Sequence, residues 1–264
     1  MEKGVPIRSL VRGIAVLQAV NRGGSLSMMD IARASGVAYP TACRIVQTLQ
    51  VEGLIEQEPT RKRYRPTALV QTLSHGYHDH TRLVQFARPH LVELTRLVVW
   101  PISLATHVGP SMVIRDSTHA LTTLTFNNYL PGYSIPILEC ASGLVYLAHM
   151  DAAERTALLD SLKRLPERIP VHILHQIEHD DLLATVREQG FASRGNNHFT
   201  RNPGKTSSIS VPIYEQGHVV GALTLGFFST AVRMTDAIDQ FVAPLKHAAS
   251  GICVDLDNSP VIAV

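Results

Sequence analysis

The stretch GVAYPTACRIVQTLQVEG, residues 36–53, decides the fold of the N-terminal part of this chain. Four apolar positions recur at the spacing of one buried helix face, namely Ala42, Ile45, Val46 and Leu49. Proline is tolerated in the first turn of a helix because the N–H that it lacks would be unpaired there. We therefore expect a helix to begin at Pro40, with Tyr39 held in an extended conformation just before it.

The sequence before this stretch predicts two further helices. Apolar residues at helical spacing lead up to Gly23-Gly24, and they are Leu10, Ile14, Leu17 and Val20. Ser27 is placed to cap a second helix, MMDIARAS, which Gly36 ends. Two helices joined by a tight turn that contains glycine are typical of a helix-turn-helix.

The predicted third helix leaves a polar face opposite its buried face. A recognition helix contacts base edges with its N-terminal residues. We therefore expect this surface to bind DNA through Tyr39, Pro40, Thr41, Arg44 and Thr48. Arg44 can bind a phosphate or the O6/N7 edge of guanine, and the sequence leaves both possibilities open.

The segment LIEQEPTRKRYRPT, residues 54–67, predicts a hairpin with a basic tip. Pro59-Thr60 marks the turn, and Arg61, Lys62 and Arg63 follow it. In isolation such a run is typical of a solvated surface, but directly after a helix-turn-helix it indicates a wing that contacts phosphates. The charge distribution agrees, since residues 1–80 carry a net charge of +4 and the remainder −2.

From residue 100 onward the pattern changes to short strands and amphipathic helices. Gly109-Pro110 and Gln216-Gly217 each separate two strand-like runs and predict hairpins over 102–117 and 207–228, with a possible third strand over 122–128. The expected helices cover 67–98 (interrupted at Pro89), 140–150, 151–165, 177–190 and 236–256. Hairpins with separate helices favour an α+β domain built on an antiparallel sheet.

Catalytic, metal-binding and membrane-spanning patterns are missing from the sequence. There is no GxSxG elbow, and Gly204-Lys205-Thr206 resembles a phosphate-binding loop that has Phe199 where glycine is required. The cluster His75, His78 and His80 has only Asp79 as a local carboxylate, so we expect no metal. We also expect no cofactor and no enzymatic activity.

Two features predict a cytoplasmic protein. No run of about 18 apolar residues is present, which predicts no membrane span. The N-terminal MEKGVPIRSLVRG has no apolar core of a signal peptide. The three cysteines are far apart in the sequence and do not suggest a disulfide scaffold.

Several segments together resemble the IclR family of bacterial transcription regulators. RSLVRGIAVLQAV, IARASGVAYPTACRIVQTLQVEGLIEQ and RYRPT are similar to the family's DNA-binding domain. VVWPISLATHVGPSMVIRDSTH and PILECASGLVYLA resemble the branch that controls hydroxyphenylpropionate catabolism, and VREQGFA and SSISVPIYEQGHVVGALTL match the effector domain. Pro40 and Cys43 depart from the family pattern on the recognition helix, so the operator sequence cannot be taken from relatives.

The resemblance implies a division into three parts. A winged helix-turn-helix, mainly helical, is expected over 1–67, a linker helix over 68–98, and a GAF-like α+β domain for effector binding and oligomerisation over 99–264.

The resemblance also implies where the effector binds. Carried onto this chain, the family's pocket would be formed by Ala141, Ser142, Arg194, Ser208, Thr224 and Gly226, with His107 as a further candidate. Small residues would leave room for a ring, hydroxyl groups would bind a carboxylate or hydroxyl, and Arg194 would pair with a carboxylate. His198 and Arg201 are alternatives for this cation.

The function implied is that of a ligand-responsive regulator of a catabolic operon. Its expected partners are double-stranded operator DNA, RNA polymerase and a small carboxylic acid, which the branch resemblance implies is aromatic. The chain is also expected to bind further copies of itself in a homodimer or homotetramer. Activation and repression both remain open. The alternative is an enzyme or small-molecule sensor that uses its N-terminal domain for protein interaction.

Overall fold

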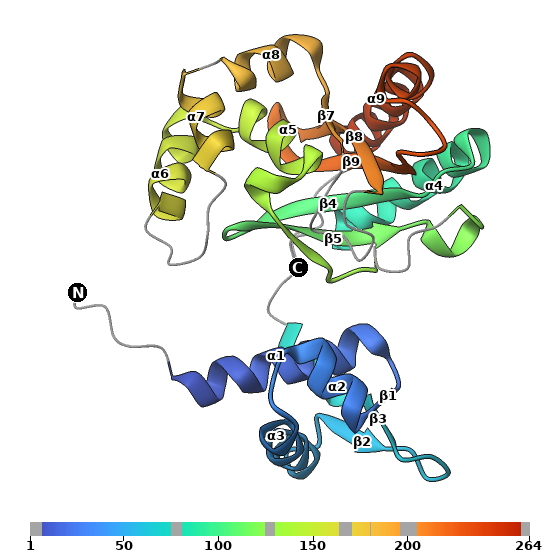
Figure 1. Ribbon diagram of the computed structural model, residues 1–264. Coiled ribbons are helices and arrows are strands. Elements are labelled where there is room, and N and C mark those ends of the chain that lie inside the picture. The colour runs from blue at the N-terminus through green and yellow to red at the C-terminus, as the bar shows by residue number, and fades with distance from the viewer. Residues whose placement is uncertain are drawn as a thin grey trace. The chain divides into compact units, whose positions relative to one another are not determined.

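In the computed structural model, two compact units divide between residues 78 and 79. The structure describes residues 7–74, 81–124, 130–163, 171–179, 181–195 and 205–259 (Figure 1). Each unit has its own buried core.

The N-terminal unit is a winged helix-turn-helix, as the sequence predicts. Its elements are α1 (Arg8–Gly23), β1 (Leu26–Ser27), α2 (Met28–Ser35), α3 (Tyr39–Val51), β2 (Ile55–Gln57) and β3 (Arg63–Pro66). The Ser27 hydroxyl accepts the Asp30 N–H at 3.2 Å and caps α2. Gly36 ends α2 in the left-handed conformation, with φ of 65°, where glycine has no steric penalty. β3 lies between β2 and β1, so the wing sheet has a third strand that the sequence did not suggest.

The structure corrects two predictions for these helices, the first residue of α3 and the buried face of α1. α3 begins at Tyr39 rather than Pro40, because the Ala38 carbonyl already accepts the N–H groups of Thr41 and Ala42 at 2.9 Å. Ala38, not Tyr39, is the extended residue before the helix. In α1 the buried face is formed by Val16, Ala19 and Val20, whereas Leu10 and Ile14 are exposed.

The expected linker segment 67–98 is not one interrupted helix. Residues Ala68–Ser74 form a 3-10 helix, η1, and α4 spans Thr81–Val98 and continues through Pro89. Proline at this position removes one backbone hydrogen bond without ending the helix. His75, His78 and His80 lie outside the described residues.

The C-terminal unit is built on a six-stranded antiparallel sheet with the order β6-β5-β4-β9-β8-β7. Its strands are β4 (Ile102–Val108), β5 (Ser111–Ser117), β6 (Ser134–Pro136), β7 (Ala192–Arg194), β8 (Thr206–Glu215) and β9 (His218–Phe228). Both predicted hairpins are present, as β4–β5 and β8–β9. The strand suggested over 122–128 is not formed by Thr122–Leu124, and residues 125–128 lie outside the described part; β6 pairs with β5 at that edge instead.

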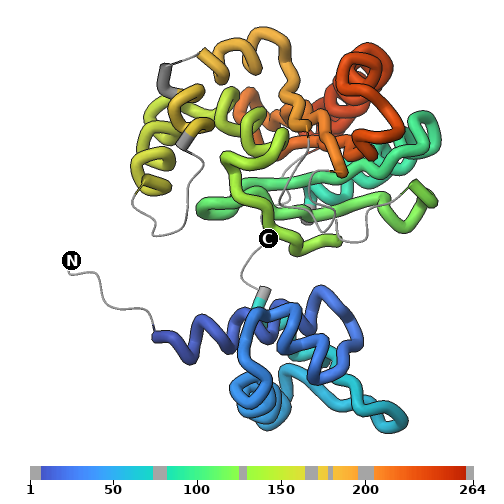
Figure 2. Tube along the Cα trace, in the orientation of Figure 1, coloured from blue at the N-terminus to red at the C-terminus, as the bar shows by residue number. Residues whose placement is uncertain are grey.

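Helices cover both faces of this sheet. α4 packs beside α9 (Met234–Asn258) on one face, and Figures 1 and 2 show α4 in blue-green and α9 in red. α5 (Ala141–His149) packs on the other face, together with α6 (Ala152–Lys163), α7 (Val171–His179) and α8 (Leu182–Gln189). The helix expected over 177–190 is divided into α7 and α8, with Asp181 between them at a φ of 51°. Two short 3-10 helices are also present. η2 (His119–Leu121) follows β5, and η3 (Ile137–Glu139) precedes α5.

Candidate functional site

The exposed face of α3 presents the predicted DNA-binding residues together. Tyr39, Pro40, Arg44 and Thr48 are exposed and Thr41 is half-buried. The Thr48 hydroxyl donates to the Arg44 carbonyl at 3.0 Å, one turn back along the helix. The neighbouring Cys43 side chain raises the pKa of Tyr39, so its phenol stays neutral and remains a hydrogen-bond donor. Within the described segments no side chain binds the Arg44 guanidinium, which leaves it available for an anionic partner.

The basic run of the wing divides into two kinds of residue. Arg61 and Lys62 lie exposed in the turn between β2 and β3. Arg63 is half-buried at the base of the wing, where its guanidinium donates to the Ser25 hydroxyl at 3.1 Å and to the Ser25 carbonyl at 2.7 Å. The structure therefore uses Arg63 to hold the wing against the segment before β1. Among the described residues of the wing, Arg61 and Lys62 remain the exposed candidates for phosphate binding.

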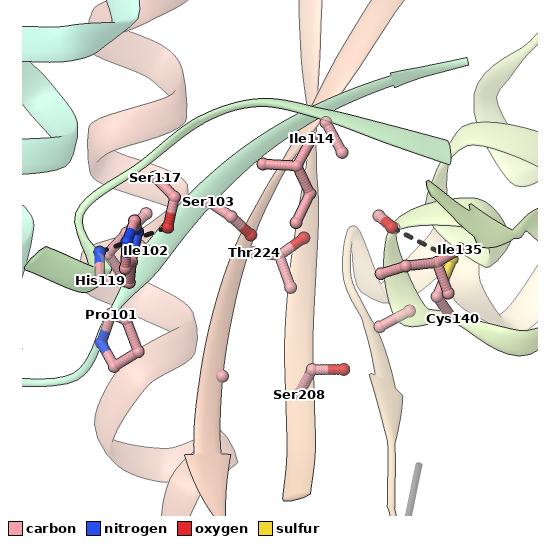
Figure 3. A pocket seen from close by; sticks show the side chains of 14 residues that line it. Pro101, Ile102, Ser103, Ile114, Ser117, His119, Ile135, Cys140, Ser208 and Thr224 are labelled. Carbon is pink, nitrogen blue, oxygen red and sulfur yellow. Dashed lines mark hydrogen bonds between the residues drawn. The ribbon is translucent and has the colours of Figure 1, made fainter. Parts of the chain in front are cut away.

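A pocket in the C-terminal unit lies between the sheet and the start of α5 (Figure 3). About 540 Å³ of space between atoms lies in it, part of it open to solvent. Its lining is apolar with hydroxyl groups interspersed. The lining residues are Pro101, Ile102, Ser103, Ala105, Ile114, Ser117, His119, Ile135, Cys140, Ala141, Ser142, Ser208, Thr224 and Gly226.

Hydroxyl groups on three adjacent strands form the polar floor of this pocket. Thr224 of β9 is paired with Ser103 of β4 on one side and with Ser210 of β8 on the other. The buried Ser210 hydroxyl lies 2.9 Å from the Thr224 hydroxyl and donates to the Leu223 carbonyl at 3.1 Å, which orients Thr224 toward the pocket. Ser208 lies one pleat further along β8, opposite Gly226. Small side chains at alternate positions of β9 leave the space above this floor.

The N-terminus of α5 forms one side of the pocket. Cys140 is the residue before the helix, and the Ser142 hydroxyl donates to its sulfur at 3.2 Å. Burial raises the pKa of the Cys140 thiol to about 11, so it adds no negative charge. A Cβ at Gly143 would lie 1.8 Å from the Ile137 carbonyl oxygen, so only glycine lets α5 pack this closely on η3. The Gly143 N–H is directed to the Cys140 sulfur, whereas those of Ala141 and Ser142 have no backbone partner among the described residues and favour an anion here.

Five of the seven effector residues expected from the sequence line the pocket. They are Ala141, Ser142, Ser208, Thr224 and Gly226. His107 does not, because it lies two pleats beyond Ser103 toward the β4–β5 turn, where its ring nitrogen is 2.6 Å from the Gly109 carbonyl oxygen. Its ring faces Tyr146 at 5.1 Å between centroids.

Arg194 also lies outside the set of lining residues. Its guanidinium is 3.5 Å from the Leu138 carbonyl oxygen and 4.0 Å from a Glu139 carboxylate oxygen. The cation is thus already partnered by the segment that leads into α5. The alternatives, His198 and Arg201, lie outside the described residues.

A second group of lining residues, at the other end of the pocket, was not predicted from the sequence. Ser103 belongs to β4, Ser117 ends β5 and His119 begins η2. Period-two alternation along ISLATHV places Ser103 on the same face as Ala105, and this pattern could have identified it. Nothing local marks Ser117 or His119, which reach the pocket because β5 ends beside the start of β4.

The described residues contain no cluster of three or more His, Cys, Asp or Glu that could hold a metal ion. Thr206, at the end of the GKT sequence, begins strand β8, whereas a phosphate-binding loop leads into a helix. Within the described segments, the helices are too short or too polar to cross a membrane.

The chain combines a winged helix-turn-helix with a sheet domain that has a small-ligand pocket. This combination is typical of one class of protein, the ligand-responsive transcription regulators. Comparison with protein families then identifies the chain. Residues 9–59 match the IclR helix-turn-helix domain, and residues 75–254 match the C-terminal domain of bacterial transcriptional regulators of the IclR type. The chain belongs to the IclR family.

Individual relatives agree with this assignment. The chain is similar to the transcriptional regulator XynR of Escherichia coli, with 25% identity over 86% of this chain and 88% of the relative. It is also similar to the glycerol operon regulatory protein of Streptomyces coelicolor, with 26% identity over 95% and 96%. A crystal structure of an IclR homolog from Microbacterium hydrocarbonoxydans, complexed with 4-hydroxybenzoate, shares the fold with a TM-score of 0.66 and 24% identity, covering 94% of this chain and 98% of the homolog.

The protein is therefore a transcriptional regulator that binds DNA through its N-terminal domain and a small molecule through its C-terminal domain. Its families and relatives are regulators and not enzymes, so the alternative of an enzyme is set aside.

Proposed function

We propose that this regulator controls a catabolic operon in response to a small aromatic carboxylic acid. The observation that supports this most is the composition of the pocket, in which apolar side chains lie beside a helix N-terminus and a floor of hydroxyl groups. Ile114 and Ile135 suit the faces of a ring. The relative from Microbacterium, which was crystallised with 4-hydroxybenzoate, has the same fold.

The carboxylate of the effector binds at the start of α5. The free N–H groups of Ala141 and Ser142 and the Ser142 hydroxyl lie at this end of the pocket, and the helix dipole adds partial positive charge. Thr224 and Ser208 supply further hydroxyl groups from the floor. Arg194 contributes indirectly by fixing residues 138–139 ahead of the helix.

Binding at this pocket changes DNA affinity through α4, the first helix after the division between the two units. The pocket-lining residue Ser117 accepts a hydrogen bond at its carbonyl from Arg88 of α4, 3.1 Å away, and Arg88 also pairs with Asp116 at 2.9 Å. The next residue, Thr118, has its hydroxyl 2.6 Å from that of Thr95 on the same helix. A ligand that moves the 116–118 segment must therefore change the contacts of α4, and differential affinity for two arrangements would shift their populations.

The DNA partner is a double-stranded operator with two-fold symmetry, bound by a homodimer or homotetramer in the cytoplasm. α3 enters the major groove with Tyr39, Pro40, Thr41, Arg44 and Thr48, and Arg61 and Lys62 of the wing bind phosphates. Exposed apolar residues at the start of α1, which are Ile7 just before the helix and Leu10, Val11 and Ile14 within it, favour contact with a second copy. RNA polymerase is a further partner if the regulator activates transcription.

A thermal-shift measurement on the full chain tests the effector class. We expect benzoate or 4-hydroxybenzoate to raise the melting temperature, because a ligand that binds only the folded state stabilises it, whereas acetate and pyruvate should not. Ala141→Leu, which fills the pocket at the start of α5, should abolish the shift relative to its own melting temperature. Ala152→Leu, at the exposed first position of α6, is the matched control and should keep it.

Two results would contradict the proposal. A shift with the aliphatic acids alone would mean that the effector is not aromatic. A shift of equal size in Ala141→Leu would mean that the aromatic acid binds elsewhere.

A further inference from the structure

His119 lies at the end of the pocket opposite the start of α5. Figure 3 shows His119 and Ser117 on one side, Cys140 on the other, and Thr224 and Ser208 between them. If the carboxylate of the effector binds at α5, the far end of the same molecule therefore faces His119.

The backbone around His119 is held firmly, so its ring has a defined place. The His119 N–H donates to the Ser117 hydroxyl at 3.3 Å. The preceding Thr118 is fully buried, and its hydroxyl accepts the Ile102 N–H at 2.8 Å and contacts the Thr95 hydroxyl at 2.6 Å. A side chain on such a support can select ligands by geometry, because the ligand has to fit an existing hydrogen-bonding direction.

The ring of His119 has hydrogen-bonding capacity that the described residues do not use. Its Nδ1 atom is shielded from solvent and has no hydrogen-bond partner among them. A shielded polar atom without a partner is costly, so a ligand hydroxyl group that pairs with it, once the ring has rotated toward the pocket, gains affinity over a ligand without that group.

We propose that His119 determines the specificity of the pocket by hydrogen-bonding a hydroxyl group on the effector, at the end of the ring opposite the carboxylate. The effector is then a hydroxylated aromatic acid. This inference rests on the proposed function, since it assumes that an aromatic carboxylate occupies the pocket with its carboxylate at α5.

Titration calorimetry of the full chain with benzoate and 4-hydroxybenzoate tests the inference, because these probes differ by one hydroxyl group. We expect the wild-type protein to bind 4-hydroxybenzoate at least about ten-fold more tightly. His119→Phe keeps a planar ring without the nitrogens, and it should lose this preference by weakening 4-hydroxybenzoate while leaving benzoate nearly unchanged. His172→Phe, at an exposed position of α7, is the matched control and should retain the preference.

The outcomes separate this inference from the proposed function. If His119→Phe weakens both acids equally, His119 does not bind the hydroxyl group and the inference is wrong, while the aromatic effector stands. If the wild-type protein binds neither acid, both are wrong. His119→Leu provides the same comparison if the Phe variant does not fold.

Discussion

Arg61 and Arg63 are two residues apart in the wing, yet their surroundings assign them different tasks. Arg61 is exposed in the turn, whereas Arg63 donates two hydrogen bonds to Ser25. The Ser25 hydroxyl in turn donates to Glu58 at 2.6 Å, so a short network closes the base of the wing. The sequence of the basic run does not show which of its arginines is exposed in the turn and which is hydrogen-bonded at the base of the wing.

At the residue scale, substitution of the two arginines should give opposite results. Arg61→Ala should weaken operator binding and reduce the slope of log affinity against log salt by about one, because one phosphate contact is lost. Arg63→Ala should lower the free energy of unfolding by about 1 kcal/mol through the lost hydrogen bonds. Fluorescence anisotropy across a salt series and chemical denaturation measure the two effects. Unchanged stability in Arg63→Ala, together with a reduced salt slope, would restore Arg63 as a DNA contact.

Among the elements, α4 connects the sheet, α9 and the pocket. Its buried side contributes Leu83, Ala87, Leu91 and Leu94 to the core, and its polar residues contact the segment that ends β5. The buried contact between Thr95 and Thr118 lies directly behind Ser117 and His119 of the pocket wall. The helix is thus placed to respond to a ligand without touching it.

Removing that contact should uncouple effector and DNA. Thr95→Val keeps the shape of the side chain and deletes the hydroxyl, so effector affinity should stay within about two-fold of wild type. The effector-dependent change in operator affinity should fall by at least about three-fold, as expected for a residue along a coupling route. Operator binding with and without effector measures this, with the exposed Thr156→Val of α6 as control. Full coupling in Thr95→Val would exclude this route.

For the whole molecule, the main feature is the division into two units with separate cores. The N-terminal core contains Val16, Ile31, Ala42, Val46 and Ile55, and none of its members belongs to the cores on the two faces of the large sheet. DNA-binding residues lie in one unit and pocket residues in the other. Each ligand should therefore stabilise the unit to which it binds.

Calorimetric unfolding of the full chain should show this division as two transitions. The aromatic acid should raise the transition of the C-terminal unit, and operator DNA should raise that of the N-terminal unit, since each binds one folded domain. A single transition that both ligands shift by the same amount would show instead that the two units unfold cooperatively.

Much of the local structure follows from short-range patterns in the sequence. Ser27 caps α2 and Gly36 ends it because side-chain and backbone chemistry act over one or two turns. The hairpins at Gly109-Pro110 and Gln216-Gly217 form for the same reason. The first residue of α3 was misplaced by one position, because the choice between Tyr39 and Pro40 depends on which carbonyl accepts the first helical hydrogen bond.

By itself, the sequence determined the winged helix-turn-helix, the antiparallel α+β domain and the small residues that border the pocket, since periodicity, capping and the family resemblance are properties of contiguous segments. Only the tertiary structure decided which polar groups meet in that pocket. In the folded chain Arg194 pairs with Glu139, His107 lies near the β4–β5 turn, and His119 lines the pocket. The physical reason is that these positions depend on strand register and on where β5 ends beside β4, which are contacts between residues distant in sequence.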